Sequence, residues 1–425
     1  MAEPLIRNIS DTALWVAMYR AMETERPDAV FRDPYARRLA GKRGEEILAT
    51  FKAAQKHAWS YTARTYLFDL FVKQEIDGGA DVVIDLAAGL DTRPYRMDLP
   101  STLQWVEIDL PELFRYKDQL LRGEKPKCRL ERIPLDLANP ASRRGVFEEL
   151  GRSAKRVLII SEGLIVYLTA DEVCALGRDL AAQPSFQRWA TDLVSPGLLK
   201  MLQKQIGTPL AQANSPLKFS PENGPKFFEN CGWKAIDVRG MLHTAKALHR
   251  LPLFLRLFAL FPDSKGTKPK QPWGGVVLLG NHMPTLERAI EIAAHAHAGQ
   301  VDKARQPYIL HPLRVMLAVK SLHERMAAVL HDVVEDTSVT IDNLRAEGFP
   351  PEVLDAVLAL TKTKGETRIA AAKRAAANPI ARLVKLADVT DNMDISRISQ
   401  PTEEDYARLK VYEQVRSILL AHGAT

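Results

Sequence analysis

The chain has 425 residues, of which 46% are hydrophobic and 26% charged, the balance of an ordinary globular protein rather than a disordered one. At roughly 100–200 residues per domain, this length predicts two or three domains. The net charge of +6 is mildly basic, but no run of Lys or Arg is long enough to indicate a nucleic-acid-binding arm, so we expect no nucleic-acid partner.

The first 80 residues are predicted to be helical, with the clearest segments at 10–22, 31–41 and 45–55. The start of the chain lacks the basic-then-apolar pattern of a signal peptide, so we expect no export. The three cysteines are widely spaced and form no CxxC pair, which indicates reduced thiols in the core. These features together predict a cytoplasmic protein.

Between residues 81 and 280, short apolar runs alternate with helical patterns. This alternation predicts a mostly parallel β-sheet with helices on both faces, an α/β fold. The expected strands are residues 81–87, 103–109, 128–136, 156–163, 188–195, 234–241 and 274–280.

The most lipophilic stretch is LPLFLRLFALF, residues 251–261, which is far shorter than the ~20 residues needed to span a bilayer. Its helical repeat predicts a helix that covers the sheet, and attachment to a membrane surface is the alternative. We therefore expect no membrane partner.

A domain boundary is predicted at NHMPT, residues 281–285, where Pro284 and Thr285 would stop one element and cap the next helix. The expected domains are residues 1–282, which hold the sheet, and residues 285–425, which are expected to be all helical.

In the first domain, VVIDLAAGLDTR predicts an apolar strand followed by an acid and a turn of small residues. Ala87, Ala88 and Gly89 would let a ligand approach the backbone at the carboxyl end of this strand. The GxGxxG pattern is absent, which argues against a nicotinamide dehydrogenase. Asp109 ends the next strand, near the ~20-residue offset at which an acid binds ribose hydroxyls. Alternatively, Asp109 caps a helix that begins at Pro111.

Six motifs follow one another in this half: SDTALWVAMYRAMETERPDAVFRDPYARRLAG, ARTYLFD, LAAGLDTRPYR, VEIDLPE, PLDL and SEGLIVYL. Together they resemble the leucine carboxyl methyltransferase-like family of S-adenosylmethionine-dependent enzymes, over about residues 7–280. The resemblance implies the class I methyltransferase fold, a Rossmann-like, seven-stranded, mostly parallel sheet that ends in an antiparallel hairpin.

The same resemblance implies S-adenosylmethionine as cofactor and assigns a role to each matching position. Arg64 would hold the methionine carboxylate, Gly89 would lie against the amino-acid portion, and Glu162 would lie near the methionine end. Asp109 would bind the ribose, and the adenine would be bordered by Asp136 and Leu137. For Arg64 and Glu162, a structural ion pair is the alternative.

The methyl acceptor is expected to be a small molecule with a carboxylate or hydroxyl group. A carboxylate is already ionised at neutral pH, so we name no catalytic base. The helical first 80 residues and residues 198–214 are expected to form the acceptor pocket.

The second domain contains AAVLHDVVEDTSVT at residues 327–340. His331 and Glu335 are four residues apart, as are Asp332 and Asp336, so all four fall on one side of a helix. A solvated acidic face is the alternative, but the flanking Ala, Val and Leu residues argue against it. A divalent cation beside these groups would make the cluster favourable.

Further candidate ligands surround this helix. RQPYILHPLRVM contributes His311, and ARLVKLADVTDNMD contributes Asp388, with Asn392 one turn later. Two histidines with two carboxylates suit Mn²⁺, Fe²⁺ or Zn²⁺. His295 and His297 are expected to be helix-packing residues instead.

The motifs PYILHPLRV, LHDVVEDT and VKLADVTDNM resemble the HD-family phosphohydrolases, in particular the ppGpp hydrolase domain of RelA/SpoT-type proteins, over about residues 285–417. The resemblance implies a divalent metal, with manganese expected, and a phosphorylated nucleotide as substrate. It implies four metal ligands, His311, His331, Asp332 and Asp388. Glu335 and Asp336 would position or deprotonate the attacking water, and the nucleotide would be contacted by Lys303 and Asn392.

This chain departs from the family pattern at two positions near the nucleotide. Asp302 stands where the family typically has a basic residue, and Val389 stands where it has an arginine. The sequence therefore leaves three hypotheses: a bifunctional methyltransferase and (p)ppGpp-type phosphohydrolase, a methyltransferase whose HD domain senses a nucleotide or hydrolyses a different one, and a non-enzymatic scaffold. A scaffold would predict a degraded metal cluster, which the sequence does not have.

Overall fold

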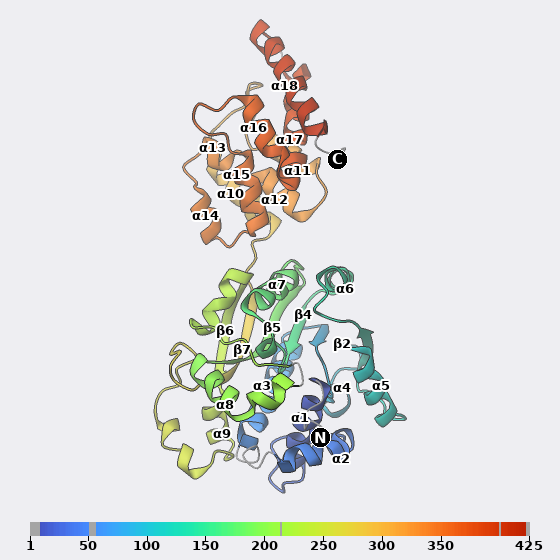
Figure 1. Ribbon diagram of the computed structural model, residues 1–425. Helices are drawn as coiled ribbons and strands as arrows, with labels where there is room; N and C mark the ends of the chain where they lie inside the picture. The colour runs from blue at the N-terminus through green and yellow to red at the C-terminus, as the bar shows by residue number, and fades with distance from the viewer. Residues whose placement is uncertain (1–8, 51–56, 213–214, 399–400, 422–425) are drawn as a thin grey trace. The chain divides into compact units, whose positions relative to one another are not determined.

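The computed structural model describes residues 9–50, 57–212, 215–398 and 401–421. The chain divides into two compact units, Met1–His282 and Met283–Thr425 (Figure 1). Each unit has its own buried apolar core, and each is described by itself below.

The first unit is built on one seven-stranded sheet with the strand order β3-β2-β1-β4-β5-β7-β6. Strands β1 to β5 pair in parallel, and β7 pairs antiparallel to both β5 and β6. The predicted Rossmann-like sheet with its antiparallel hairpin is confirmed. The strands are β1 (Val82–Leu86), β2 (Gln104–Asp109), β3 (Arg129–Pro134), β4 (Val157–Ser161), β5 (Phe186–Val194), β6 (Trp233–Gly240) and β7 (Gly274–Asn281).

The burial of each strand follows its place in the sheet. β1 and β4, with the sequences VVIDL and VLIIS, are central and buried along their whole length. The edge strand β3, RLERIP, is exposed or half-buried at every position. Strand order reverses between β1 and β4, and in open α/β sheets ligands bind at the carboxyl ends of the strands beside such a reversal.

Helices cover this sheet, and the long helix α3 contributes Leu67, Phe68, Phe71 and Val72 to the core against it. The predicted helix at 45–55 corresponds to the end of α2, and residues 51–56 lie outside the described residues. The helices of this unit are α1 (Ile9–Thr24), α2 (Ala36–Thr50), α3 (Ala58–Asp77), α4 (Arg93–Arg96), α5 (Pro111–Leu120), α6 (Pro140–Ser153), α7 (Ala170–Ala181), α8 (Pro196–Gln212) and α9 (Met241–Ala247), with short 3₁₀ turns η2 (Ile165–Tyr167), η3 (Gly224–Cys231), η4 (Leu253–Leu255) and η5 (Phe258–Leu260).

The prediction of a helix that covers the sheet at residues 251–261 is wrong. Pro252 precedes a 3₁₀ turn, η4, which is followed by the separate turn η5, so the chain makes no continuous helix here. Only Leu251 and Ala259 of this stretch are fully buried, and most of its apolar side chains face solvent.

The expectation of three reduced cysteines is also wrong. Cys174 on α7 and Cys231 at the end of η3 form a disulfide across a sequence separation of 57 residues, whereas Cys128 is free and buried. The packing of α7 against η3 brings the two Cα atoms to 5.0 Å, a proximity that sequence spacing does not reveal.

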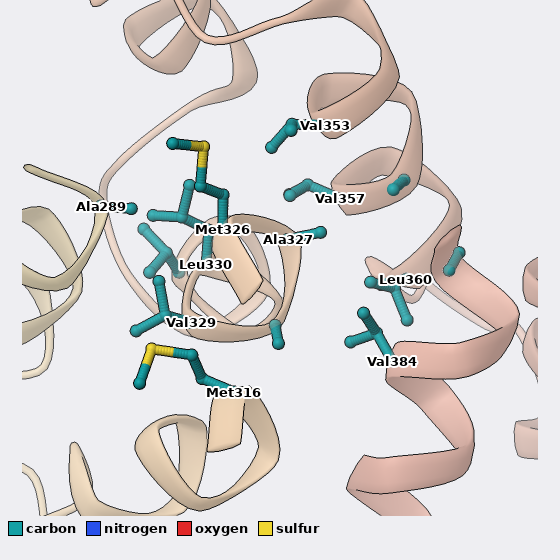
Figure 2. Packing of buried hydrophobic residues seen from close by; sticks show 14 of the residues in the cluster. Ala289, Met316, Met326, Ala327, Val329, Leu330, Val353, Val357, Leu360 and Val384 are labelled. Carbon is teal, nitrogen blue, oxygen red and sulfur yellow. The ribbon is translucent and has the colours of Figure 1, made fainter. Parts of the chain in front are cut away.

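The second unit is an all-helical domain around the central helix α12. Figure 2 shows Met326, Ala327, Val329 and Leu330 of α12 packed among apolar side chains of the neighbouring helices. Its helices are α10 (Leu286–Ala296), α11 (Leu310–Leu317), α12 (Leu322–Leu330), α13 (Val333–Asp336), α14 (Ile341–Ala346), α15 (Pro351–Leu360), α16 (Arg368–Ala376), α17 (Pro379–Asn392) and α18 (Glu403–Ala421), with the 3₁₀ turn η6 (Ile395–Arg397). Among the described helices of the chain, none has the length and apolar character to cross a bilayer.

Candidate functional site

The first unit has a cavity of about 480 Å³ at the carboxyl ends of β1, β2 and β4. Its wall includes every cofactor-binding residue expected from the sequence: Arg64, Gly89, Asp109, Asp136, Leu137 and Glu162. These residues come from α3, from the last residue of β2 and from the segments that follow β1, β3 and β4, so only the folded sheet gathers them.

Asp109 at the end of β2 fixes the conformation of the turn after β1 by hydrogen bonding. The backbone N–H of Gly89 donates to Oδ2 of Asp109 at 2.6 Å, and that of Leu110 donates to Oδ1 at 2.7 Å. Ala87 and Gly89 both have positive φ, 54° and 49°, and the Ala87 conformation is costly for a residue with a Cβ. Leu110, not Asp109, is the N-cap of α5, so the structure does not support the helix-capping alternative.

Arg64 takes part in an ion-pair network within the wall of this cavity. Its Nε donates to Glu162 at 3.0 Å and its Nη1 to Asp192 at 3.1 Å. Burial opposes the charge, but Glu162 and Asp192 raise the pKa of Arg64 above its ordinary value. The Arg64–Glu162 pair of the alternative interpretation is therefore present, and within the described chain the Nη2 of Arg64 has no acceptor.

A second buried arginine, which the sequence analysis missed, fixes the other side of Glu162. Arg93 donates to Glu162 at 2.8 Å, to Asp91 at 2.7 Å and to Asp69 at 2.7 Å. Arg93, Asp91 and Asp192 all line the cavity. The available signal was the DTR sequence directly after the small-residue turn.

Asp85 of β1 is the acid that the sequence analysis noted in VVIDLAAGLDTR without assigning it a role. Its carboxyl is almost fully buried and lines the cavity, and its Oδ2 has no hydrogen-bond partner among the described residues. Burial raises the pKa of Asp85 well above its ordinary value, and nearby Asp91 and Glu107 raise it further. An unpartnered buried carboxyl oxygen at a cavity wall is suited to a ligand that donates a hydrogen bond or brings a positive charge.

Asp136 and Leu137 lie where the cavity opens beyond β3. Asp136 is exposed, and its Oδ1 accepts from the backbone N–H of Ala138 at 2.9 Å. The carbonyl of Leu137 accepts from Arg143 at 3.0 Å, which fixes the backbone of this edge.

The remainder of the cavity is apolar and aromatic. Trp15 and Val16 of α1, Tyr61 of α3, and the α8 residues Leu202 and Ile206 line it. The expected acceptor segment 198–214 thus contributes α8 side chains to the wall, whereas residues 213 and 214 lie outside the described residues.

The second unit has a cavity of about 390 Å³ with a buried cluster of candidate metal ligands at its wall. One ligand atom from each of His311, His331 and Asp388 lies within 4.8 Å of the others. Oδ1 of Asp388 is 3.2 Å from Nε2 of His311 and 3.7 Å from Nε2 of His331. α11, the C-terminal end of α12, and α17 supply these three groups.

The two histidine rings are oriented by contacts at their Nδ1 atoms. Nδ1 of His331 lies 2.7 Å from the carbonyl oxygen of Ala328, and Nδ1 of His311 lies 2.7 Å from Asp391. When Nδ1–H donates to these acceptors, both Nε2 lone pairs face the shared space, as in metal-ligating histidines. Nε2 of His331 is buried without a hydrogen bond in the described part of the chain.

The charges at this cluster fit a cation. Burial opposes a charged imidazole, yet Asp332 and Asp388 raise the pKa of His331 to about 10. His331 in turn lowers the pKa of Asp332 to about 2, against the effect of burial. These carboxylates therefore favour a positive charge between them, and a divalent ion would satisfy that requirement together with the two Nε2 atoms.

Asp332 adjoins the three-residue cluster. Its Oδ2 lies 3.1 Å from Nε2 of His331 and 3.8 Å from Nε2 of His311, and it accepts from the Tyr308 hydroxyl at 2.7 Å. All four expected metal ligands thus lie close together. On the other side of Asp388, Lys385 donates to Oδ2 at 2.9 Å.

The structure separates the two expected water-positioning acids. Glu335 lines the cavity, and its carboxylate accepts from the backbone N–H of Lys362 at 2.7 Å. Asp336, which is exposed as Glu335 is, is not one of the described residues that line this cavity.

The two residues expected to contact the nucleotide, Lys303 and Asn392, are bonded to other residues of the protein. Lys303 lines the cavity and pairs with Asp405 at 3.0 Å, and Asn392 donates to the carbonyl of Asp388 at 3.1 Å. Asp302 and Val389 both line the cavity, but Val389 is only 1% exposed and packs in an apolar cluster. His297 is buried and packs with its ring 4.8 Å from that of Tyr308, as expected, but His295 is exposed, so the same prediction is wrong for His295.

The sheet order and the strand-end cavity define the first unit as a class I methyltransferase fold, and the helical His/Asp cluster defines the second as an HD-type domain. Family models match accordingly: "Leucine carboxyl methyltransferase" over residues 13–181 and "HD domain" over residues 289–415. The chain belongs to the S-adenosyl-L-methionine-dependent methyltransferases of leucine carboxyl methyltransferase type and carries a C-terminal HD domain. Both resemblances noted from the motifs are confirmed.

Two relatives carry the methyltransferase assignment. A putative S-adenosyl-L-methionine-dependent methyltransferase of Frankia alni is 32% identical over 237 residues, which are 53% of this chain and 82% of the relative. One from Streptomyces avermitilis is 30% identical over 234 residues, with the same two coverages, 53% and 82%.

Two solved structures are also similar. A metazoan SpoT ortholog, described as hydrolysing ppGpp, is 26% identical over 32% of this chain and 84% of its own, with a TM-score of 0.28. A DUF574 family protein from Streptomyces avermitilis is 14% identical over 61% of this chain and 95% of its own, with a TM-score of 0.41.

Proposed function

We propose that the first unit transfers a methyl group from S-adenosylmethionine to a carboxylate or hydroxyl oxygen of a small, largely apolar molecule. The observation that carries this proposal is a single cavity that is lined by polar groups on one part of its wall and by apolar groups on the other. Charged and backbone polar groups gather at the strand ends, and aromatic and aliphatic side chains of α1, α3 and α8 form the rest. Family membership supports the donor.

In this proposal, Asp109 binds the ribose while holding the Gly89 turn, and the adenine lies at Asp136 and Leu137. Arg64, whose Nη2 has no acceptor among the described residues, binds the methionine carboxylate beside Gly89 and Glu162. The donor supplies an activated methyl group, and the chain's task is to align donor and acceptor and to exclude water.

We expect Asp109→Ala to weaken S-adenosylmethionine binding by about 2–3 kcal/mol, because charge-assisted hydrogen bonds are lost. The Gly89 turn also loses its acceptor at 2.6 Å. Calorimetry on the full chain measures the affinity. Glu112→Ala, an exposed acid on α5, is the control and should bind normally. Equal affinities for the Asp109 variant and the unchanged protein would refute the ribose role, and no binding by the unchanged protein would refute the donor.

We further propose that the second unit is a metal-dependent phosphohydrolase acting on a (p)ppGpp-type nucleotide in the cytoplasm, with manganese as its metal. Buried His311, His331 and Asp388 with adjoining Asp332 support a divalent site, and Glu335 stands in the same cavity. A divalent ion there supplies a Lewis acid that lowers the pKa of water. Glu335 would orient that water and accept its proton, while Asp336 has a lesser part because it lies outside the cavity wall.

A second candidate is a domain that senses a nucleotide without turnover, or that hydrolyses another phosphorylated nucleotide. The observation that favours it is the charge of the cavity wall near the expected nucleotide contacts. Asp302 adds a carboxylate there, and Lys303 is paired with Asp405. Like charge beside a polyphosphate is unfavourable even when screened.

Metal analysis of the purified chain together with a hydrolysis screen separates these candidates. The screen includes ppGpp and nucleotides with single 2′- or 3′-phosphates, each with and without a chelator. Chelator-sensitive ppGpp hydrolysis supports the first candidate, and chelator-sensitive hydrolysis of another nucleotide supports the altered specificity. Nucleotide binding without any turnover supports sensing, and hydrolysis that survives metal removal contradicts the metal mechanism.

A further inference from the structure

The stretch between α9 and β7 presents an unusual apolar surface. Six large side chains are between 63% and 76% exposed there, and we name them the 253–261 surface: Leu253, Phe254, Leu257, Phe258, Leu260 and Phe261. In Figure 1 this stretch is the yellow chain beyond α9. Scattered exposed apolar residues are ordinary, but a contiguous group of this size marks an interaction site.

This surface is a fixed feature of the fold. Leu251 and Ala259 are only 3% and 4% exposed and belong to the core of the first unit. The side chain of Lys246 donates to the carbonyl of Ala259 at 3.1 Å, and Nε2 of His243 lies 2.9 Å from the carbonyl oxygen of Phe261. The buried anchors and the α9 contacts hold η4 and η5 in place, with their apolar side chains turned outward.

The charge around the 253–261 surface is strongly positive. Residues 241–273 contain six Lys and Arg residues but a single acid, Asp263. Asp263 is occupied by the backbone N–H of Gly240 at 2.9 Å and the indole N–H of Trp273 at 2.7 Å. Five of the six cations have no ion-pair partner among the described residues and are exposed: Lys246, Arg256, Lys265, Lys268 and Lys270.

We propose that the 253–261 surface docks the protein peripherally onto an anionic lipid bilayer. Leucine and phenylalanine side chains gain free energy on entering the acyl boundary, while the flanking cations remain at the headgroups and attract acidic lipids. This interaction is independent of the chemistry of either cavity. It takes up the alternative of membrane-surface attachment, because the covering helix that was preferred to it is not present in the structure.

Charge and shape favour a bilayer over a second copy of the chain. A symmetric dimer would pair the surface with itself and bring the two sets of cations together without acids to neutralise them. None of the six side chains lines either of the two cavities described above, and all six are exposed to solvent. An exposed apolar surface flanked in the sequence by exposed cations suits insertion into the headgroup region.

Cosedimentation of the full chain with vesicles tests the proposal, using phosphatidylcholine alone and phosphatidylcholine with about one-third phosphatidylserine. We expect binding to the acidic vesicles that decreases with added salt. The variant Phe254→Ser/Phe258→Ser should lower the partition coefficient about tenfold or more. Lys265→Gln/Lys268→Gln should lower it by about fivefold per lysine on acidic vesicles only.

The matched control is Leu317→Ser, because Leu317 is 73% exposed but lies on α11 of the other unit. It should bind vesicles as the unchanged chain does. S-adenosylmethionine binding and the thermal unfolding curve of each variant report whether the fold is intact. All variants should bind the cofactor normally, since no substituted residue lines the first cavity.

Four outcomes would overturn the proposal. The unchanged chain could fail to sediment with acidic vesicles, or the Phe254/Phe258 variant could sediment as well as the control. Sedimentation velocity without lipid could also show a dimer that the same variant dissociates, which would make a second copy the occupant. A lipid-binding defect in the Leu317 control would show that the loss is unspecific and equally overturn it.

Discussion

Asp388→Ala is expected to remove the metal from the second unit and to abolish its phosphohydrolase activity. Oδ1 of Asp388 lies 3.2 Å from Nε2 of His311 and 3.7 Å from that of His331, so its loss takes a carboxylate from the centre of the cluster. The buried amine of Lys385 also loses its partner at 2.9 Å and adds repulsion against a cation. Metal affinity should fall by more than about 100-fold. Losing a residue that only supports a metal ligand costs up to about 100-fold, and Asp388 is expected to bind the metal itself.

Metal content by elemental analysis and hydrolysis rates check this prediction. Asp302→Ala is the matched control, since Asp302 is an aspartate of the same cavity wall outside the ligand cluster, and its metal content should be unchanged. S-adenosylmethionine binding of Asp388→Ala should also be unchanged, because the two units have separate cores. Full metal occupancy in Asp388→Ala would show that the cluster is not the metal site.

Glu335→Gln is expected to keep the metal and to slow hydrolysis by about 10²–10⁴-fold, the usual contribution of a positioned acid or base. Glutamine keeps the shape of the side chain and can still accept from the backbone N–H of Lys362, so the fold of this segment should persist. It cannot take a proton from water. The effect should appear in kcat, with nucleotide binding and metal content almost unchanged.

Asp336→Asn is the comparison for Glu335→Gln. Asp336 is four residues after Asp332 and is exposed, but only Glu335 is part of the cavity wall. We expect a much smaller loss of rate for Asp336→Asn. Equal losses would mean that both acids act on the water, and a metal-free Glu335→Gln would mean that Glu335 helps to hold the ion instead.

The α/β part of the fold was predictable because its central strands are fully buried and therefore strongly patterned. VVIDL and VLIIS are continuous apolar runs bounded by acids and turns, and the structure places them as β1 and β4 at the centre of the sheet. The helical character of the second half was equally visible. The resemblance to known families then supplied the strand order and the hairpin, which local patterns alone do not contain.

The sequence was less informative wherever the answer depended on contacts between distant segments. Apolar periodicity cannot tell a helix that covers a sheet from two turns that face solvent, so the 251–261 prediction was wrong. Cys174 and Cys231 meet only because α7 packs on η3. Arg93 donates hydrogen bonds to Asp69, Asp91 and Glu162, and these three acids come from separate segments that only folding brings together.

The sequence also did not reveal the contacts of Val389, a residue that was considered for the nucleotide site. From sequence, an arginine at this position would restore a contact to the nucleotide. In the structure Val389 is part of the cavity wall, but it is buried among Ala372, Ala376, Val415 and Leu419. Val389→Arg would overpack this cluster and bury a charge, so a loss of stability would obscure any gain in substrate binding. Of Asp302 and Val389, only Asp302 can therefore be substituted to test substrate specificity without an expected loss of stability.

The buried carboxyl of Asp85 is expected to couple ligand binding in the first cavity to the release of a proton. Because burial and neighbouring acids raise its pKa, Asp85 tends to retain a proton while its Oδ2 is unpartnered. A ligand with a positive charge at this wall, such as the ammonium group of S-adenosylmethionine, favours the carboxylate. Binding should therefore release a proton, and affinity should rise with pH until the raised pKa is passed. Calorimetry in buffers of different ionisation enthalpy would count that proton, and in Asp85→Asn the count should fall toward zero.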